Sequence, residues 1–190
     1  RRVAHRDVKP SNVLCQGTHT KLCDFGLSKR ADATATYATH TAGVGTPAFM
    51  SPELITGGAH ALPDSFAAPA DVFAFAMLLH CTWTCRLPFE AYDDDDDQAA
   101  AVRSDDDDDD DGGKPRARPP LGAFALMSKI AAGQRPALPD DMPPRLKALI
   151  AACWAQQPNQ RPTMAHVVDD LLAAYKEEKQ HHSPFISRII

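Results

Sequence analysis

The sequence predicts a mainly α-helical domain with a small β-hairpin near its N-terminus. Two short runs, Val13 to Cys15 and Lys21 to Cys23, flank a polar turn that contains a glycine, which is the pattern of a hairpin. Beyond Ala70 the apolar residues follow helical spacing over long stretches. At 190 residues the chain suits one domain, or one lobe of a larger domain, and it is long enough to bury a core.

Three stretches predict the helices of the body. DVFAFAMLLHCTW, which begins at Asp71, is apolar nearly all round, as expected of a helix buried in the middle of a domain. PPRLKALIAACWAQ starts with two prolines and carries an apolar stripe from Leu146 to Cys153. TMAHVVDDLLAAYKEE begins with a threonine suited to cap a helix, and its expected apolar stripe is Val167, Leu171 and Leu172.

Residues 91–120 interrupt this pattern with two aspartate runs and a stretch rich in Pro and Gly. Asp93 to Asp97 and Asp105 to Asp111 hold 12 of the 25 acidic residues, so the net charge of −5 comes from this segment. Like charges in a run repel one another and bury no apolar surface, so we expect a disordered insertion. A Ca²⁺ site is the alternative, but an aspartate run lacks the fixed turn and the carbonyl ligands of a calcium loop.

Composition bounds the class of protein. Outside the aspartate runs, the excess of Lys and Arg suits either a phosphate-bearing partner or an ordinary solvated surface. The five cysteines, an odd number, indicate reduced thiols and hence a cytoplasmic protein, with the nucleus as the other compartment. No apolar run approaches the roughly 20 residues of a membrane span. We expect no nucleic-acid partner and no membrane segment. Because a starting methionine is absent, we also expect the chain to be part of a longer parent protein.

HRDVKPSN, from His5 to Asn12, crowds titratable and amide side chains into one short segment. Transfer of a γ-phosphoryl group needs a carboxylate to accept a proton, cations to spread charge, and oxygen ligands to hold metal ions. Asp7, Lys9 and Asn12 supply these groups, and Asp24 of the later DFG stretch offers a second metal ligand. Taken alone, the HRD triplet would be interpreted as a surface turn that holds a local Arg–Asp pair, which is common. The order of several motifs together favours the chemistry.

That order resembles the larger, C-terminal lobe of protein kinases. HRDVKPSN resembles the catalytic loop, with Val8 where leucine is usual, and DFG at Asp24 follows after one hairpin. GTPAFMSPE, which ends at Glu53, resembles the end of the activation segment, with Ser51 in place of an alanine. DVFAFAMLL, RLPF and CWAQQPNQRP follow in family order. The last of these, together with HRDVKPSN, resembles most the tyrosine-kinase-like group of serine/threonine kinases.

The resemblance implies ATP and Mg²⁺ as cofactors and assigns residues to them. Asp7 is implied to be the catalytic base, Lys9 marks serine/threonine specificity, and Thr46 is implied to contact both. The residues implied to bind the nucleotide and its metal are Asn12, Leu14, Cys23 and Asp24. In this set the amide and the carboxylate hold the metal, while the leucine and the cysteine line the floor and the back of the adenine pocket.

The resemblance also implies regulatory and structural residues. Arg6 would pair with a phosphate on the activation segment, residues 24–53, and position favours Thr39 or Thr41 as the phosphate acceptor. The implied structural residues are His5, Phe25, Glu53, Asp71 and Arg161. The histidine and phenylalanine would belong to a hydrophobic spine. The aspartate would hold the catalytic loop by its backbone, and the glutamate would form a buried ion pair with the arginine.

These implications predict a serine/threonine kinase that acts on protein substrates and that an upstream kinase activates. Residues 1–190 would form a partial kinase domain, because the Gly-rich loop and the strand lysine of the N-terminal lobe are absent from the chain. We expect the chain alone to be inactive. A truncated or degenerate kinase acting as a non-catalytic scaffold is the alternative. The evidence against it is that four expected active-site residues are intact, namely Asp7, Lys9, Asn12 and Asp24. Small-molecule phosphotransferases share part of the pattern but lack GTPAFMSPE.

Overall fold

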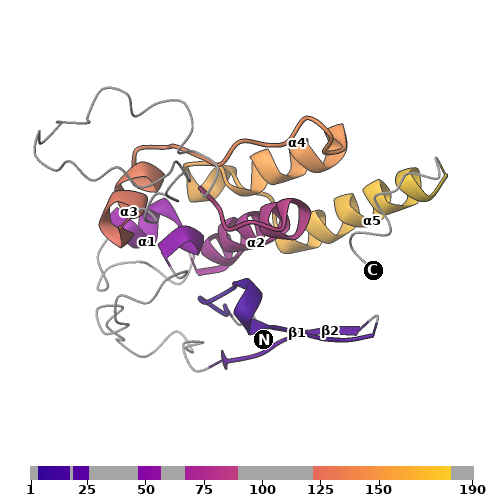
Figure 1. The fold of residues 1–190 in the computed structure, drawn as a ribbon, viewed down its shortest axis with the longest axis horizontal. Coiled ribbons are helices and arrows are strands. Elements are labelled where there is room, and N and C mark those ends of the chain that lie inside the picture. The colour runs from indigo at the N-terminus through magenta and orange to yellow at the C-terminus, as the bar shows by residue number, and fades with distance from the viewer. Residues whose placement is uncertain (1–3, 18, 26–46, 57–66, 90–121, 181–190) are drawn as a thin grey trace, which may run out of the picture.

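The computed structural model describes residues 4–17, 19–25, 47–56, 67–89 and 122–180. The expected acidic insertion and most of the expected activation segment lie outside these residues. Helices dominate the described part, and a two-stranded antiparallel sheet lies beside them (Figure 1). The prediction of a mainly α-helical fold with a small hairpin is confirmed.

The hairpin consists of β1 (Val13–Gln16) and β2 (His19–Leu22), and the short 3-10 helix η1 (Pro10–Asn12) precedes it. Gly17 lies in the turn with φ 57°, a left-handed conformation that glycine adopts without steric cost. The pairing continues to Gln16 and His19, which are closer to the turn than the predicted apolar runs. Because strand pairing depends on backbone hydrogen bonds, the strands continue through the polar residues at which the predicted apolar runs stop.

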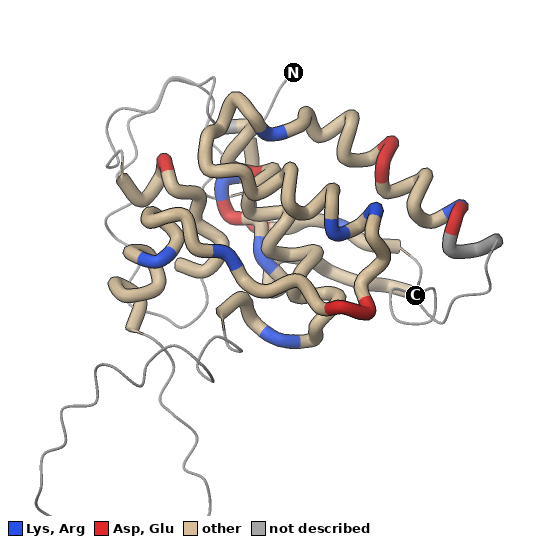
Figure 2. Tube along the Cα trace, turned by 90° about the horizontal axis from the view of Figure 1, so that it is seen from above, with Lys and Arg blue, Asp and Glu red and all other residues tan. Residues whose placement is uncertain are grey.

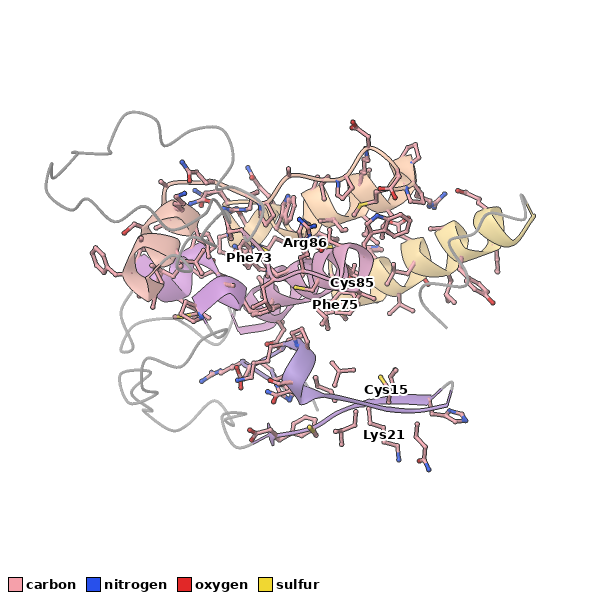
Figure 3. All side chains as sticks on the ribbon, viewed as in Figure 1. Cys15, Lys21, Phe73, Phe75, Cys85 and Arg86 are labelled. Atoms are coloured by element: carbon pink, nitrogen blue, oxygen red, sulfur yellow. The ribbon has the colours of Figure 1, made fainter. Side chains whose placement is uncertain are left out.

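The hairpin is a thin element whose side chains are mostly exposed. Cys15 and Lys21 point to opposite faces of it (Figure 3), as the alternation of side chains along a strand requires. Leu14 is 58% exposed, although it is a large apolar residue. The sheet therefore contributes little to the core and mainly connects the N-terminal loop to the residues that follow Leu22.

Within the described residues the body contains five α-helices and two further 3-10 turns. The helices are α1 (Pro52–Thr56), α2 (Ala67–Thr84), α3 (Ala123–Ala131), α4 (Pro144–Cys153) and α5 (Met164–Gln180). The turns are η4 (Pro47–Phe49) and η6 (Pro158–Gln160). Helix α2 packs against α4, α4 packs against α5, and α1 packs against α3 (Figure 1).

Helix α2 forms the centre of the core. Phe73, Ala76 and Met77 are fully buried, and much of the rest of the helix is buried as well. This agrees with the prediction from its all-round apolar sequence, although the helix begins at Ala67, before the predicted start. A helix surrounded in this way provides a rigid base on which other elements can hold side chains in fixed positions.

The stripe predicted for α4 is buried, whereas the stripe predicted for α5 is only partly correct. Val167 is fully buried and Leu171 packs against the core, but Leu172 is 52% exposed. Successive residues of a helix are separated by about 100°, so a helix that covers its neighbour with one face turns either Leu171 or Leu172 outward. The predicted cap is present, because Thr163 Oγ1 accepts the His166 N–H at 3.3 Å.

Charged residues of both signs are interspersed over the described chain (Figure 2). Arg145 of α4 reaches two acidic residues of α5, Asp170 at 3.0 Å and Glu177 at 2.7 Å. These pairs are exposed and contribute at most about 1 kcal/mol each. No helix among the described residues is long and apolar enough to cross a membrane.

His80 joins α2 to the segment between α3 and α4. Its buried ring donates from Nε2 to the Ala137 carbonyl at 3.0 Å, while Nδ1 has no hydrogen-bond partner among the described residues. Burial lowers the pKa of His80 below 6.5, and the bond to Ala137 opposes this effect. The ring is therefore neutral in the folded chain at neutral pH.

We expect His80 to make the fold sensitive to mild acid. Because its pKa is lower in the folded chain, the unfolded chain takes up a proton at a higher pH. The free energy of unfolding should fall as the pH drops through 6.5 towards the folded-state pKa, and level off below it. Urea titrations at several pH values should show a smaller fall for His80→Gln, which keeps a donor for Ala137. An equal fall in both proteins would contradict this role.

Candidate active site

The segment that begins at His5 is anchored to the central helix by backbone hydrogen bonds. The Asp71 carboxylate of α2 accepts the His5 N–H at 2.6 Å and the Arg6 N–H at 2.7 Å. Arg6 has φ 67°, a left-handed conformation that is unusual for a residue other than glycine. Burial raises the pKa of the Asp71 carboxyl, and the two backbone hydrogen bonds oppose that rise. This contact fixes the sharp bend from which Asp7 extends.

Asp7 is surrounded by two donors on one side of its carboxylate. Lys9 Nζ lies 2.8 Å from Asp7 Oδ2, and Asn12 Nδ2 donates to the same oxygen at 2.9 Å. The Asn12 amide also donates to the Asp7 backbone carbonyl at 2.8 Å. Among the described residues, Oδ1 of Asp7 receives no hydrogen bond. The arrangement orients the carboxylate and leaves Oδ1 available to an incoming donor.

His5 links this carboxylate to the segment after the hairpin. Its Nε2 lies 2.9 Å from the Cys23 carbonyl, which can only accept, so Nε2 carries the proton. Nδ1 then accepts the Asp7 N–H at 3.3 Å, and the His5 ring packs edge-on against Phe25 with centroids 4.7 Å apart. Because His5 is almost fully buried, this bridge holds Asp7 and the segment at Cys23 in a fixed position relative to each other.

A backbone hydrogen bond at the base of the hairpin places Asp24 near Asn12. The Cys23 N–H donates to the Asn12 carbonyl at 2.9 Å, so the residue before Asp24 is tied to the residue that contacts Asp7. Asp24 has φ 61°, a second left-handed residue other than glycine. Such conformations are costly and gather at functional sites. The structure thus brings Asp7, Lys9, Asn12 and Asp24 into one neighbourhood.

The residues at this site suit a hard divalent cation. Mg²⁺ prefers oxygen ligands and usually takes one or two protein carboxylates together with phosphate oxygens and waters. The side-chain NH₂ group of Asn12 donates to Asp7, which leaves the side-chain oxygen Oδ1 for another partner. No group of three His, Cys, Asp or Glu side chains in the described part forms a metal cluster of its own. A metal here would be held jointly by the Asn12 side-chain oxygen, the Asp24 carboxylate and the oxygens of a phosphate ligand.

Glu53 and Arg161 form a buried pair away from Asp7. The two guanidinium nitrogens lie 2.7 Å from the two carboxylate oxygens, and the Arg161 side chain is fully buried. Arg161 also donates to the Pro69 and Ala155 carbonyls at 2.9 Å each. The pair therefore joins α1 to the start of α2 and to the residues that follow α4.

Arg135 lies beside this pair and was not singled out from the sequence. Its guanidinium lies 4.9 Å from the centroid of the Phe73 ring, and that of Arg161 lies 5.0 Å from the same centroid. Burial and the charge of Arg161 lower the pKa of Arg135 to about 10. A lone arginine before a proline looks like an ordinary surface residue, so no sequence signal marks it.

Several predicted residues are described only in part or not at all. Leu14 and Phe25 are more than half exposed, and Cys23 is half-buried. Arg6 is also half-buried. Thr39, Thr41 and Thr46 lie outside the described residues, so their predicted roles stay predictions.

Comparison with known proteins decides the family of the chain. Residues 1–172 match the protein kinase domain. The chain belongs to the protein kinase family. The predicted family membership is confirmed, and the cluster around Asp7 is the candidate active site of a kinase domain.

Individual relatives of this kinase domain are named as protein kinases, and some of them as serine/threonine kinases. It is 30% identical over 168 residues to a "probable serine/threonine-protein kinase" of Dictyostelium discoideum, which covers 88% of this chain and 14% of that protein. It is also 30% identical over 167 residues to human mitogen-activated protein kinase kinase kinase 7, which covers 86% of this chain and 21% of that protein. The chain spans about a tenth to a fifth of the length of the curated relatives it matches.

Removal of the Asp71 carboxylate should loosen the loop of this kinase domain. Asp71→Ala leaves the N–H groups of His5 and Arg6 without their acceptor, and an unpaired buried donor costs about 1–3 kcal/mol. We expect the free energy of unfolding to fall by about 2–3 kcal/mol, measured by urea denaturation. The matched control is Asp169→Ala, because Asp169 is exposed on α5 and should change stability by less than about 0.5 kcal/mol. Equal effects of the two variants would contradict the anchoring role.

Ser51 offers a stabilising substitution next to α1. Its hydroxyl is fully buried and has no hydrogen-bond partner among the described residues. Ser51→Ala removes this unsatisfied group without losing a bond, so the free energy of unfolding should rise by about 1 kcal/mol. Thr56→Ala in α1 serves as the control. The Thr56 hydroxyl donates to the Pro52 carbonyl at 2.9 Å, so its loss should not raise the free energy of unfolding. A loss of stability in Ser51→Ala would show that the hydroxyl is bonded.

Proposed function

We propose that the protein carrying this chain is a serine/threonine kinase that transfers the γ-phosphoryl group of ATP to Ser and Thr hydroxyls of proteins. Residues 1–190 would supply the C-terminal lobe of its kinase domain, interrupted by the insertion at 91–120. The observation that carries the proposal is the Asp7 carboxylate, with Lys9 and Asn12 on Oδ2 and no donor on Oδ1 among the described residues.

In this proposal Asp7 accepts the proton of the attacking hydroxyl at Oδ1. The two donors on Oδ2 keep the carboxylate turned in one direction, which lowers the entropy cost of aligning the nucleophile. Lys9 places a positive charge beside the group that moves. Asn12 and Asp24 would hold Mg²⁺, which supplies charge neutralisation to the phosphates when bound.

Other residues complete the proposal. Leu14, with its exposed side chain, and Cys23 would line the adenine pocket, and Thr46 would contact Asp7 and Lys9. Arg6 would bind a phosphate that an upstream kinase places on Thr39 or Thr41. The HRDVKPSN and CWAQQPNQRP stretches support membership of the tyrosine-kinase-like group. The Dictyostelium relative, named as a probable serine/threonine kinase, supports serine/threonine specificity, and the thiols support a cytoplasmic or nuclear location.

Phosphoamino-acid analysis tests the proposal. The full-length protein, incubated with Mg·ATP and a mixture of Ser, Thr and Tyr peptides, should label Ser and Thr only. Asp24→Asn should lose the label while its urea midpoint stays unchanged. Label on tyrosine would contradict the specificity, and no label in the wild type would favour the scaffold alternative. Transfer by residues 1–190 alone would contradict the expectation that this chain needs a further lobe.

A further inference from the structure

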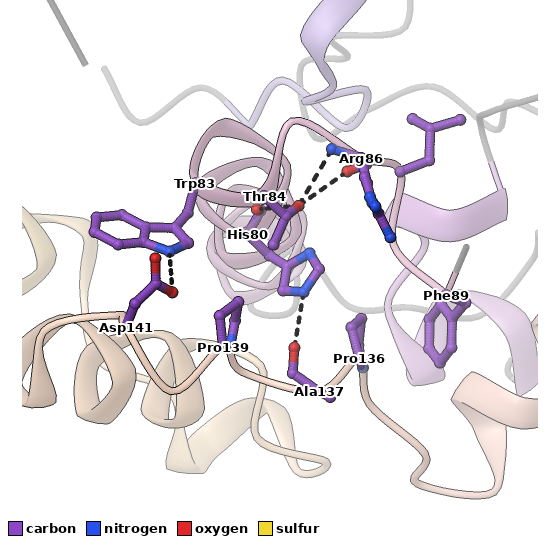
Figure 4. Close-up of a pocket in the computed structure, with 10 residues that line it drawn as sticks. His80, Trp83, Thr84, Arg86, Phe89, Pro136, Ala137, Pro139 and Asp141 are labelled. Atoms are coloured by element: carbon purple, nitrogen blue, oxygen red, sulfur yellow. Dashed lines mark hydrogen bonds between the residues drawn. The ribbon is translucent and has the colours of Figure 1, made fainter. Parts of the chain in front are cut away.

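A cavity of about 380 Å³ lies at the opposite end of α2 from Asp71. It opens between the C-terminal end of α2 with residues 84–89 and the segment 136–141 that joins α3 to α4 (Figure 4). Its volume falls within the range of about 300–1,000 Å³ typical of small-molecule sites. None of the residues that line it belongs to the candidate active site, so it needs a separate explanation.

Apolar side chains form much of the wall of this pocket, and the wall is held in place. Trp83 and Phe89 are buried to more than nine-tenths, and Leu87 and Pro139 add further apolar surface. The bond from His80 Nε2 to the Ala137 carbonyl fixes one wall against the other, at 3.0 Å. A flat apolar group of about the size of one ring would therefore find a largely preformed site.

Arg86 supplies a positive charge at one side of the pocket. Its backbone is fixed by Thr84, whose hydroxyl accepts the Arg86 N–H at 3.3 Å and also donates to the His80 carbonyl at 2.9 Å. The Arg86 side chain extends over the pocket between His80 and Phe89 (Figure 4). Among the described residues its guanidinium forms neither a hydrogen bond nor an ion pair. The structure thus places a cation with open bonding capacity over a partly apolar cavity.

The negative charge in the lining lies elsewhere. The Trp83 indole N–H donates to Asp141 Oδ1 at 3.3 Å, so this carboxylate is held at the Trp83 side of the pocket. Figure 4 shows Asp141 and Arg86 on different sides of His80. The pocket is therefore polarised, and an anionic ligand would be directed to Arg86 and repelled by Asp141.

We propose that this pocket binds a small aromatic or branched aliphatic carboxylate, with its apolar group against Trp83 and Phe89 and its carboxylate on Arg86. The planar guanidinium matches the geometry of a carboxylate, which can accept two parallel hydrogen bonds. Two sources share this chemistry, namely a free organic acid and the C-terminal residue of a peptide. The site is independent of the proposed phosphoryl transfer.

Ligand-observed NMR titrations of the full-length protein test this proposal. The probes are 3-phenylpropionate and the uncharged 3-phenylpropanamide, which differ only in the group that would face Arg86. The acid should bind roughly five-fold more tightly than the amide, as expected for a partly exposed ion pair. In Arg86→Gln the two probes should bind equally. This ratio does not depend on the overall stability of the variant.

Two further variants and one further probe sharpen the test. Ala137→Trp fills the pocket and should abolish binding of both probes, whereas Ala148→Trp, on an exposed position of α4, should leave it unchanged. Acetyl-Gly-Phe with a free carboxylate identifies a peptide source if it binds more tightly than 3-phenylpropionate, and a free acid if it binds more weakly. The proposal is overturned by equal affinity of acid and amide in the wild type, by a preference that persists in Arg86→Gln, by binding in Ala137→Trp, or by no binding at the solubility limit.

Discussion

Replacement of Arg161 by methionine is expected to lower the free energy of unfolding by about 3–5 kcal/mol. The substitution leaves the Glu53 carboxylate in a site where it is 10% exposed and has lost both of its guanidinium donors. It also removes the donors to the Pro69 and Ala155 carbonyls. A buried charge without a partner is among the most destabilising changes that a single substitution makes. Urea denaturation followed by far-UV circular dichroism would measure the loss.

The comparison with an exposed pair separates burial from charge. Arg145→Met breaks the contacts to Asp170 and Glu177, and it should cost less than about 1 kcal/mol because these groups are exposed. The double variant Glu53→Met and Arg161→Met should be more stable than Arg161→Met alone, since no unpaired charge remains. If Arg161→Met cost no more than Arg145→Met, the buried pair would not be a structural element of this kinase domain.

The sequence predicts those elements whose pattern depends on local spacing. The hairpin, α2 and α4 follow from apolar runs and helical stripes that extend over many residues. Helix α1 was not predicted, because its five residues, Pro52–Thr56, are too few to show a helical period. Helix α3 was not predicted either; it is short and directly follows the insertion. The exposure of Leu172 depends on which face of α5 meets α4, and that is a property of tertiary packing, which a stripe alone does not specify.

The site divides in a similar way. The residue types around Asp7 and their order were readable because phosphoryl transfer demands them. The bridge formed by His5, from the Asp7 N–H to the Cys23 carbonyl, was not readable, since it depends on a ring orientation that only the fold provides. Arg135 was missed for the same reason, because its position over Phe73 requires two segments far apart in the chain to meet. The pocket beside Arg86 likewise arises from segments more than 40 residues apart in the chain.

The proposed mechanism predicts its largest effect at Asp7. Asp7→Asn keeps the size of the side chain and an oxygen that can accept from Lys9 or Asn12, but an amide cannot take the proton of the attacking hydroxyl. The rate of phosphoryl transfer in the full-length protein should fall about 10²–10⁴-fold, the usual contribution of a general base. Single-turnover assays at saturating Mg·ATP would measure the fall, and ATP affinity should stay within about two-fold because binding does not need the base.

Lys9→Met provides the matched comparison for this variant. It removes the charge from Oδ2 but leaves the Asp7 carboxylate with its bond from Asn12, so the base remains in place without one of its two orienting donors. Transfer should therefore slow in Lys9→Met, but the rate should stay above that of Asp7→Asn. If Asp7→Asn retained more than about a tenth of the wild-type rate, another group would accept the proton and Asp7 would only position its neighbours.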